Sequence, residues 1–196
     1  MAKSNQQLPE FSAQSRQEWR DWLQANHATS SGIWLVSFKK NSGKPRVSYD
    51  EAVEEALCFG WIDSVPNKLD DERFKQLFTP RKPKSGWSRV NKQRIDKLIA
   101  GGLMTEAGLT KIEQAKQDGS WTKLDEVEDL TVPADLEAAF AENSTARQYF
   151  EGFPKSVKRG ILEWLNNARR SETRQTRIAQ IVRMAAQNKR AQFDKE

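Results

Sequence analysis

The hydrophobic residues near the start of the chain recur with the spacing of an α-helix. Trp19, Trp22 and Leu23 fall on one helical face, with polar residues between them. The preceding segment Ser15-Arg16-Gln17-Glu18 is a capping box, in which the serine hydroxyl and the glutamate carboxylate satisfy otherwise unpaired backbone amides. The pattern predicts a helix from Ser15 to near Asn26.

A second helix is predicted by the same two signals. Ser48-Tyr49-Asp50-Glu51 is again a capping box. The apolar stripe that follows has helical spacing and consists of Tyr49, Ala52, Val53, Ala56 and Leu57. Gly60 can adopt the left-handed conformation that ends such a helix.

Three segments have the composition of β-strands. Residues 32–39 are rich in β-branched and aromatic side chains, and they precede a turn containing Gly43. Residues 61–66 and 73–79 read as a hairpin joined by a polar loop. We expect these three strands to form a small antiparallel sheet. Such a sheet is too small to be stable alone in water, so the apolar helix faces must cover it.

Helical patterns dominate the rest of the chain. Helices are expected at about 86–100, 105–117, 134–141 and 145–150. Thr105 is a suitable cap, and Pro154 suits the first turn of a further helix. The last two helices form a hairpin that turns near Arg170. Residues 119–133 lack periodicity and are acidic, which is typical of a linker.

The predicted class is therefore α+β, with helix predominating. The antiparallel sheet and its covering helices precede a helical C-terminal bundle. The expected organisation is a flexible arm at 1–14, an α+β domain at 15–124, an acidic linker at 125–133 and a helical C-terminal domain at 134–190.

Composition limits the class of protein. Hydrophobic residues make up 37% of the 196 residues, and seven are tryptophan, which is enough for a real core. A single cysteine excludes an internal disulfide. No stretch is apolar for long enough to predict a membrane span, and no hydrophobic signal core follows Met1. We therefore expect a cytoplasmic protein that does not insert into membranes.

Charge is distributed unevenly along the chain. The formal net charge is +5, which predicts weak attraction to polyanions. Residues 106–142 carry a net charge of −7, whereas residues 152–196 carry +7. The opposite signs suggest that the C-terminal helices dock on the acidic middle of the chain. Burial of apolar stripes must supply most of the docking energy, because an exposed ion pair contributes only about 0–1 kcal/mol.

The most distinctive segments of the chain are Gly32–Lys40, Tyr49–Asp63, Phe78–Arg81, Lys158–Ile161 and Ala168–Arg174. In these segments the chain resembles the YdeI/OmpD-associated family of bacteriocin-protection proteins. The resemblance spans about residues 11–190. It implies a bacterial intracellular protein with an α+β N-terminal part and a helical C-terminal part. The resemblance also implies a role in bacteriocin protection and the stress response, without a catalytic residue set.

A candidate ligand site lies around the predicted hairpin. Alternation along a strand places Trp61 and Asp63 on one face, and an acid there needs a cationic partner such as Arg73 or Arg81. One interpretation is an Asp–Arg pair that pins the hairpin. The other is an aromatic pocket with Asp63 and Arg81 as polar anchors, whose lining would include Trp34, Trp61, Phe74 and Trp87.

Two basic sets are candidate contacts for a polyanion. The first surrounds Trp87 and comprises Lys82, Lys84, Arg89 and Lys92. The second has helical spacing and comprises Arg170, Arg174 and Arg177. An ordinary solvated surface is the alternative interpretation.

These observations favour a binding module over an enzyme. No complete set of nucleophile, base and orienting residue is visible, so we assign no catalytic residue. One histidine and one cysteine cannot complete a zinc site, and we expect no metal and no cofactor. His27 is expected at a solvent-facing helix end, and Glu55 on a solvated face. The predicted function is binding of an unidentified small ligand or protein partner in the aromatic pocket. There are two alternatives. One is an enzyme that uses Asp63 with Arg81 and Glu54, and the other is a protein that binds nucleic acid weakly.

Overall fold

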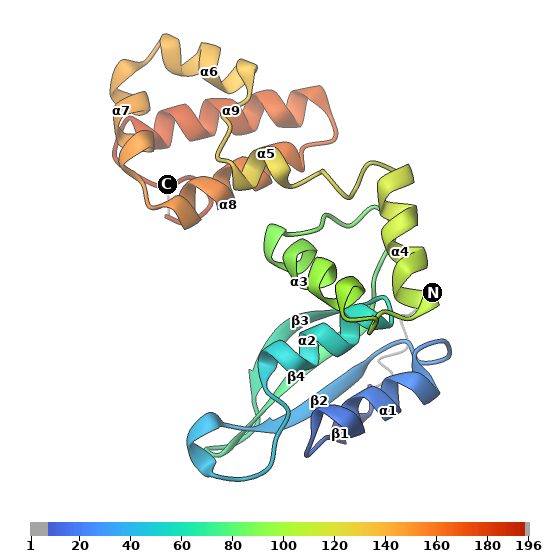
Figure 1. Ribbon diagram of the computed structural model, residues 1–196. Helices are drawn as coiled ribbons and strands as arrows, with labels where there is room; N and C mark the ends of the chain where they lie inside the picture. Colours follow the sequence, from blue (N-terminus) through green and yellow to red (C-terminus); the bar gives the residue numbers. More distant parts are fainter. Residues whose placement is uncertain (1–7, 195–196) are drawn as a thin grey trace, which may run out of the picture. The chain divides into compact units, whose positions relative to one another are not determined.

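The computed structural model describes residues 8–194 (Figure 1). The chain divides into two compact units between Thr122 and Lys123. Each unit has a hydrophobic core of its own. We describe the two units separately.

The N-terminal unit contains one four-stranded sheet. The strands are β1 (Glu10–Ser12), β2 (Ile33–Phe38), β3 (Trp61–Lys68) and β4 (Arg73–Pro80), in the spatial order β1-β2-β4-β3. Strands β2, β4 and β3 pair antiparallel, and β1 pairs parallel to β2. The α+β class is confirmed. The prediction of a three-stranded antiparallel sheet is wrong in detail, because β1 makes the sheet four-stranded and mixed.

Strand β1 lies in the segment that was predicted to be a flexible arm. The ring of Phe11 stacks against Trp22 at 5.9 Å and Trp19 at 6.4 Å between centroids, and Ala13 is buried. A three-residue strand has too few positions to display a pattern, so its order depends on these tertiary contacts. Residues 1–7 of the predicted arm lie outside the described part of the chain.

Helices α1 (Arg16–Asn26) and α2 (Tyr49–Cys58) supply the apolar faces that cover the sheet. Both begin at the predicted serine caps, and the capping box at Ser48 is complete. Trp19 packs on Phe78 of β4 at 5.2 Å between ring centroids. The indole N–H of Trp19 donates to the backbone oxygen of Ala52 at 3.0 Å, which ties α1 to α2. Gly60 takes a φ of +72°, the left-handed conformation expected at the end of α2.

Two further helices complete the N-terminal unit, α3 (Arg89–Ala100) and α4 (Glu106–Gln117). Ser88 caps α3 by accepting a hydrogen bond from the backbone N–H of Asn91. Thr105 occupies the N-cap position of α4, but its hydroxyl donates to the backbone oxygen of Cys58 at 2.6 Å. A Cβ at Gly108 would lie 2.3 Å from that same oxygen, so α4 approaches α2 through a glycine. A short 3₁₀ turn, η1 (Lys40–Ser42), follows β2.

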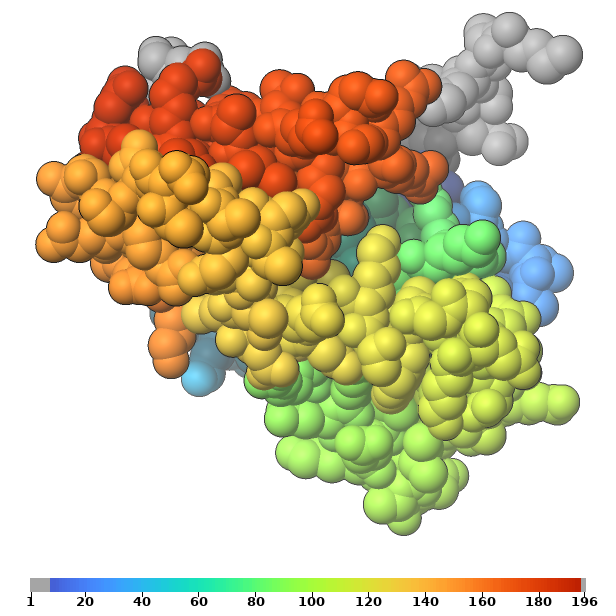
Figure 2. Space-filling model, turned by 90° about the horizontal axis from the view of Figure 1, so that it is seen from above, coloured from blue at the N-terminus to red at the C-terminus, as the bar shows by residue number. Residues whose placement is uncertain are grey.

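The C-terminal unit is helical within its described residues. Its helices are α5 (Asp125–Glu128), α6 (Ala134–Ala141), α7 (Ser144–Gly152), α8 (Lys155–Asn166) and α9 (Ser171–Ala185). The packed surfaces of α6 to α9 are coloured orange to red in Figure 2. Val127 of α5 is 1% exposed and belongs to this core. The segment predicted as a linker at 125–133 therefore contains a packed helix, which is too short to show periodicity.

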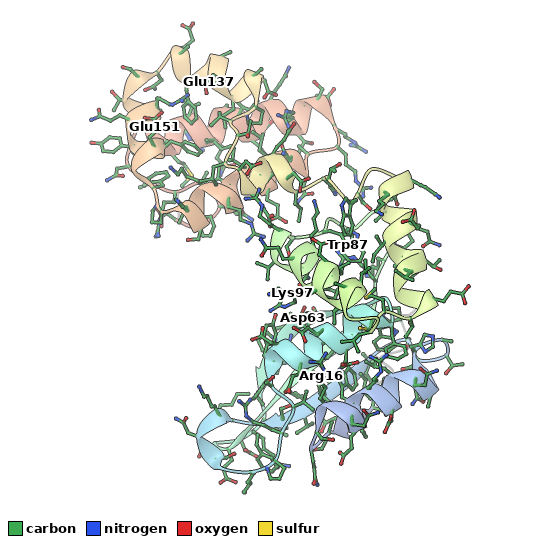
Figure 3. All side chains as sticks on the ribbon, viewed as in Figure 1. Arg16, Asp63, Trp87, Lys97, Glu137 and Glu151 are labelled. Carbon is green, nitrogen blue, oxygen red and sulfur yellow. The ribbon has the colours of Figure 1, made fainter. Side chains whose placement is uncertain are left out.

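Opposite charges meet inside the C-terminal unit. Arg174 of α9 binds both carboxylate oxygens of Asp135 on α6, and Arg159 of α8 lies 3.8 Å from Glu128 of α5. Arg147 pairs with Glu137 and Glu151, which Figure 3 labels on α6 and α7. The predicted docking of basic helices on acidic ones occurs here between neighbouring helices. Among residues 8–194, no helix combines the length and apolarity needed to cross a lipid bilayer.

Candidate functional site

The predicted aromatic site is divided by the pleat of the sheet. Trp61 pairs with Pro80, and its side chain lies on the core face, 1% exposed. Trp34 pairs with Leu77 between the buried residues Ile33 and Leu35, so its side chain points to the opposite face. The ammonium of Lys75 lies 5.0 Å from the Trp34 ring centroid on that face. The sheet therefore separates Trp34 from Trp61.

Asp63 belongs to a polar network rather than to an ion pair with Arg81. Its Oδ2 accepts a hydrogen bond from the hydroxyl of Tyr49 at 2.8 Å and a long one from Gln76 at 3.5 Å. Burial and the hydrogen bond to Asp63 raise the pKa of Tyr49 to about 12, so Tyr49 remains a donor at neutral pH. Figure 3 labels Asp63 on the sheet, whereas Trp87 lies before α3. The expected pairing of Asp63 with Arg81 is absent from the described residues.

Arg81 and Trp87, two of the predicted ligand residues, are both buried and lie side by side. Its guanidinium carbon lies 3.5 Å from the Trp87 ring centroid, and Nη2 donates to the backbone oxygen of Gly86. Both side chains line a small cavity next to α4. Burial lowers the pKa of Arg81 to about 10, and attraction from Asp63 only partly offsets this.

The remaining predicted ligand residues lie toward the hairpin end. Arg73 binds Asp70 through Nε at 2.7 Å, on the exposed surface. Phe74 pairs with Ser37 of β2 and Lys68 of β3, six positions along β4 from Pro80. These residues stabilise the hairpin turn. They do not join Trp61 in one pocket.

A pocket of about 670 Å³ in the N-terminal unit does contain Trp61. It lies between the end of α1, the start of β3 and the first turns of α4. Its apolar wall includes Phe59, Trp61 and Pro80. Its polar wall includes His27, Thr110 and Lys111. The volume lies within the range of about 300–1,000 Å³ that is usual for small-molecule sites.

His27 is held in this pocket by contacts with Leu23, Phe59 and Trp61. It is the C-cap of α1, and its backbone oxygen accepts a hydrogen bond from the indole N–H of Trp61 at 3.1 Å. Its Nδ1 lies 2.9 Å from the backbone oxygen of Leu23, so Nδ1 carries a proton and Nε2 remains for a ligand. The His27 ring also contacts Phe59 at 5.1 Å between centroids. The expectation of a simple solvent-facing helix end missed this arrangement.

Helix α4 provides the positive side of the pocket. Lys111 forms no ion pair with any residue of the described range 8–194. The N-terminus of α4 faces the pocket through Thr105, Glu106 and Ala107, and no side chain caps it. A Cβ at Gly60 would lie 2.7 Å from Cγ of Lys111, so this glycine allows the lysine stem to lie against β3. The exposed carboxylate of Glu106 is the opposing charge at the rim.

Glu55 is a buried charge that the sequence reasoning placed on a solvated face. Its side chain is 2% exposed and binds Arg16 and Arg20, each at 2.6 Å. Arg16 is labelled in Figure 3. The helical stripe contained the signal, because position 55 lies between the buried positions 52, 53 and 56. Glu54 binds Arg16 at 2.9 Å and stays 27% exposed, so it does not join Asp63.

The two predicted basic sets belong to different units. Lys82, Lys84 and Arg89 are exposed, whereas Lys92 lies 5.3 Å from the ring centroid of Trp121. In the C-terminal unit Arg174 is held by Asp135, and Arg177 donates to the backbone oxygen of Trp164. Arg170 is exposed at the start of α9. Arg174 and Arg177 are thus committed to intramolecular contacts.

An apolar groove of about 840 Å³ lies along α9. It is lined by Ile178 and Val182 of α9, and by Ala139 of α6. Elsewhere, residues 8–194 contain no group of three or more His, Cys, Asp or Glu side chains arranged to share a metal ion. A third hollow, of about 620 Å³, lies between α6 and α7. The His27 pocket has a basic residue, Lys111, on its α4 side.

Comparison with protein families matches two parts of the chain. Residues 129–188 match the family described as "Bacteriocin-protection, YdeI or OmpD-Associated", and residues 11–111 match a domain of unknown function, DUF8412. Curated proteins and solved structures gave no match. The N-terminal segments attributed above to the YdeI/OmpD resemblance thus fall within the DUF8412 match. The chain belongs to the DUF8412 family, whose model matches residues 11–111, and it carries a YdeI/OmpD-associated, bacteriocin-protection domain at residues 129–188.

Proposed function

We propose that this protein binds a small organic acid with a planar apolar part, in the pocket between His27, Trp61 and α4. One observation carries the proposal: the 670 Å³ pocket places an unpaired lysine and an uncapped helix N-terminus opposite an aromatic wall. The aromatic wall suits the planar part of the ligand. The positive end of the α4 dipole and Lys111 suit its carboxylate.

His27 and Thr110 add hydrogen-bonding groups to the same wall. With Nδ1 fixed by the oxygen of Leu23, Nε2 is available to a polar substituent of the ligand. The carboxylate of Glu106 is exposed to water at the rim of the pocket. Its negative charge disfavours a ligand that carries a second acidic group. These features favour a monoacid over a polyanion.

Matched probes test the charge requirement. We expect benzoate to bind the full chain with a dissociation constant in the millimolar range, because so small a ligand makes few contacts. Benzamide, which has no charge, should bind at least about tenfold more weakly. Binding is measured by isothermal titration calorimetry at constant ionic strength. Lys111→Met should abolish the preference for benzoate.

Lys116→Met is the control, because Lys116 lies on the same helix and pairs with Glu113 at 2.9 Å outside the pocket. This variant should bind benzoate as the native chain does. Equal affinity for benzoate and benzamide in the native chain, or equal losses in the two variants, would overturn the proposal.

The biological setting forms part of the same proposal. We place the protein in the cytoplasm, where its ligand would be a small metabolite or an inhibitor relevant to stress or bacteriocin protection. The name of the family matched at residues 129–188 supports the bacteriocin-protection part of this proposal. Growth of a deletion strain under bacteriocin challenge, complemented by the native chain or by Lys111→Met, tests it. If both chains restore growth equally, bacteriocin protection does not depend on ligand binding in the pocket.

A further inference from the structure

Arg81 is a buried guanidinium with two unused donors. The residue is 5% exposed, yet Nε and Nη1 have no hydrogen-bond partner. Only Nη2 is engaged, by the backbone oxygen of Gly86. Leaving a buried donor unpaired costs about 1–3 kcal/mol, and more when the donor is charged. Such a group calls for a partner that the protein itself does not provide.

The cavity beside Arg81 is positively charged. Arg81, Lys82, Lys84 and Lys111 line it, together with a single carboxylate, that of Asp118. The Asp118 carboxylate is occupied by the backbone N–H of Ser120 at 2.9 Å and by the backbone N–H of Lys84. These hydrogen bonds lower the pKa of Asp118 and hold the carboxylate against the loop. The cavity is therefore lined by four cationic side chains and by one carboxylate that already accepts hydrogen bonds from the backbone.

The size of the cavity limits its occupant. Its volume is about 10 Å³, close to the smallest volume that holds one water molecule, about 10–15 Å³. A phosphate, a sulfate or the carboxylate of benzoate does not fit without opening the loop. A monatomic anion is larger than water but much smaller than these oxyanions, so it requires the smallest displacement of the exposed side chains of Lys82 and Lys84. It would also balance the charge of the buried guanidinium and accept its hydrogen bonds.

We propose that the cavity next to Arg81 and Trp87 is a binding site for a monatomic anion, chloride under ordinary conditions. The anion accepts hydrogen bonds from Nε and Nη1 of Arg81. It links the loop at 82–86 to the end of α4, whose residues Gln114 and Asp118 also line the cavity. The site is independent of the benzoate pocket, although Lys111 borders both.

Bromide provides a direct test, because it replaces chloride and scatters anomalously. Crystals of the full chain, grown without halide, are soaked in sodium bromide. The proposal predicts an anomalous peak within hydrogen-bond distance of Nε and Nη1 of Arg81. A water molecule at that place, with no anomalous peak, would overturn it.

Thermal unfolding provides the second test in solution. At constant ionic strength, replacing sodium gluconate with sodium chloride should raise the melting temperature of the native chain by a few degrees, because the anion binds only the folded state. Any general stabilisation by sulfate should be the same in the native chain and in Arg81→Met. Arg81→Met should lose the chloride increment, whereas Lys82→Met at the rim should keep most of it. Equal melting temperatures in chloride and gluconate, or an undiminished chloride increment in Arg81→Met, would contradict the proposal.

Discussion

Burial separates the roles of two adjacent glutamates on α2. Glu55 is 2% exposed and accepts hydrogen bonds from Arg16 and Arg20, whereas Glu54 is 27% exposed and binds Arg16 alone. Removing one partner of a buried ion pair leaves uncompensated charge and is strongly destabilising. An exposed pair contributes little. The same chemical change at neighbouring positions should therefore have different consequences.

We expect Glu55→Gln to lower the free energy of unfolding by about 3 kcal/mol, because two guanidinium groups lose their shared carboxylate. The matched variant Glu54→Gln should cost less than about 1 kcal/mol. Urea unfolding at pH 7, followed by tryptophan fluorescence, measures both. Similar costs for the two variants would show that Glu55 is not the structural anchor of α1.

The sequence pattern predicted Trp61 as a residue of the candidate site but did not predict His27. Strand alternation placed Trp61 and Asp63 on one face of the sheet, and the structure shows that this is the face of the buried residue Phe78. The same alternation excludes Trp34 from that face, but only once the register with β4 is known. His27 enters the pocket through its contacts with Leu23, four residues earlier on α1, and with Trp61, a partner 34 residues away that spacing in the sequence does not reveal.

At the scale of elements, capping chemistry predicted helix starts well. Ser15 and Ser48 cap their helices through the side chain as predicted, because each hydroxyl accepts a hydrogen bond from a backbone N–H of the first turn. Thr105 occupies the predicted N-cap position without a capping hydrogen bond, and the cap at Ser88 was not predicted. Short elements were missed. Strand β1 and helix α5 span three and four residues, and their order comes from packing of Phe11 and Val127.

Close packing of α4 on α2 provides an element-scale prediction. A Cβ at Gly108 would meet the backbone of Cys58, whereas a Cβ at Gly152 in α7 would meet nothing within 4 Å. Gly108→Ala should cost about 2–3 kcal/mol through overpacking, and Gly152→Ala should stabilise by about 0.5 kcal/mol through a less flexible unfolded chain. Thermal unfolding of both variants checks the pair. A neutral Gly108→Ala would mean that α4 does not approach α2 so closely.

The contact between α6 and α9 should depend on pH. Hydrogen bonds from Arg174 hold the pKa of Asp135 below its usual value of 3.8. A carboxyl with a lowered pKa contributes stability above the unfolded pKa and loses it as the pH falls through the folded value. Asp135→Asn should therefore cost up to about 1 kcal/mol at pH 7, since the pair is partly exposed.

Urea titrations of the native chain and Asp135→Asn at a series of pH values measure this difference. The gap between them should shrink as the pH falls below 3.8. A gap that persists unchanged at lower pH would assign the loss to packing rather than to charge.

At the scale of the whole molecule, the chain consists of two folding units with separate cores. The first core contains Trp19, Trp61 and Phe78, and the second contains Phe140, Phe150 and Leu165. The division at Thr122 and Lys123 lies between the two family matches, which end at residue 111 and begin at residue 129. The boundary between the two compact units therefore lies in the segment between the two family matches.

We expect fragments 1–122 and 123–196 to fold when expressed separately, because each retains its own core. Circular dichroism should show helical content and a cooperative thermal transition for both. The helical fragment should be the less stable, since a smaller domain buries a smaller share of its surface. A fragment without a cooperative transition would contradict independent folding.

The central claim, a small-acid site in the N-terminal unit, is tested most directly by mapping benzoate on the full chain with ¹H–¹⁵N correlation spectra. The account predicts saturable shifts at His27, at the indole N–H of Trp61 and along residues 105–111, with little change in α6 to α9. Shifts concentrated along the α9 groove, or an unchanged spectrum at high benzoate concentration, would contradict it.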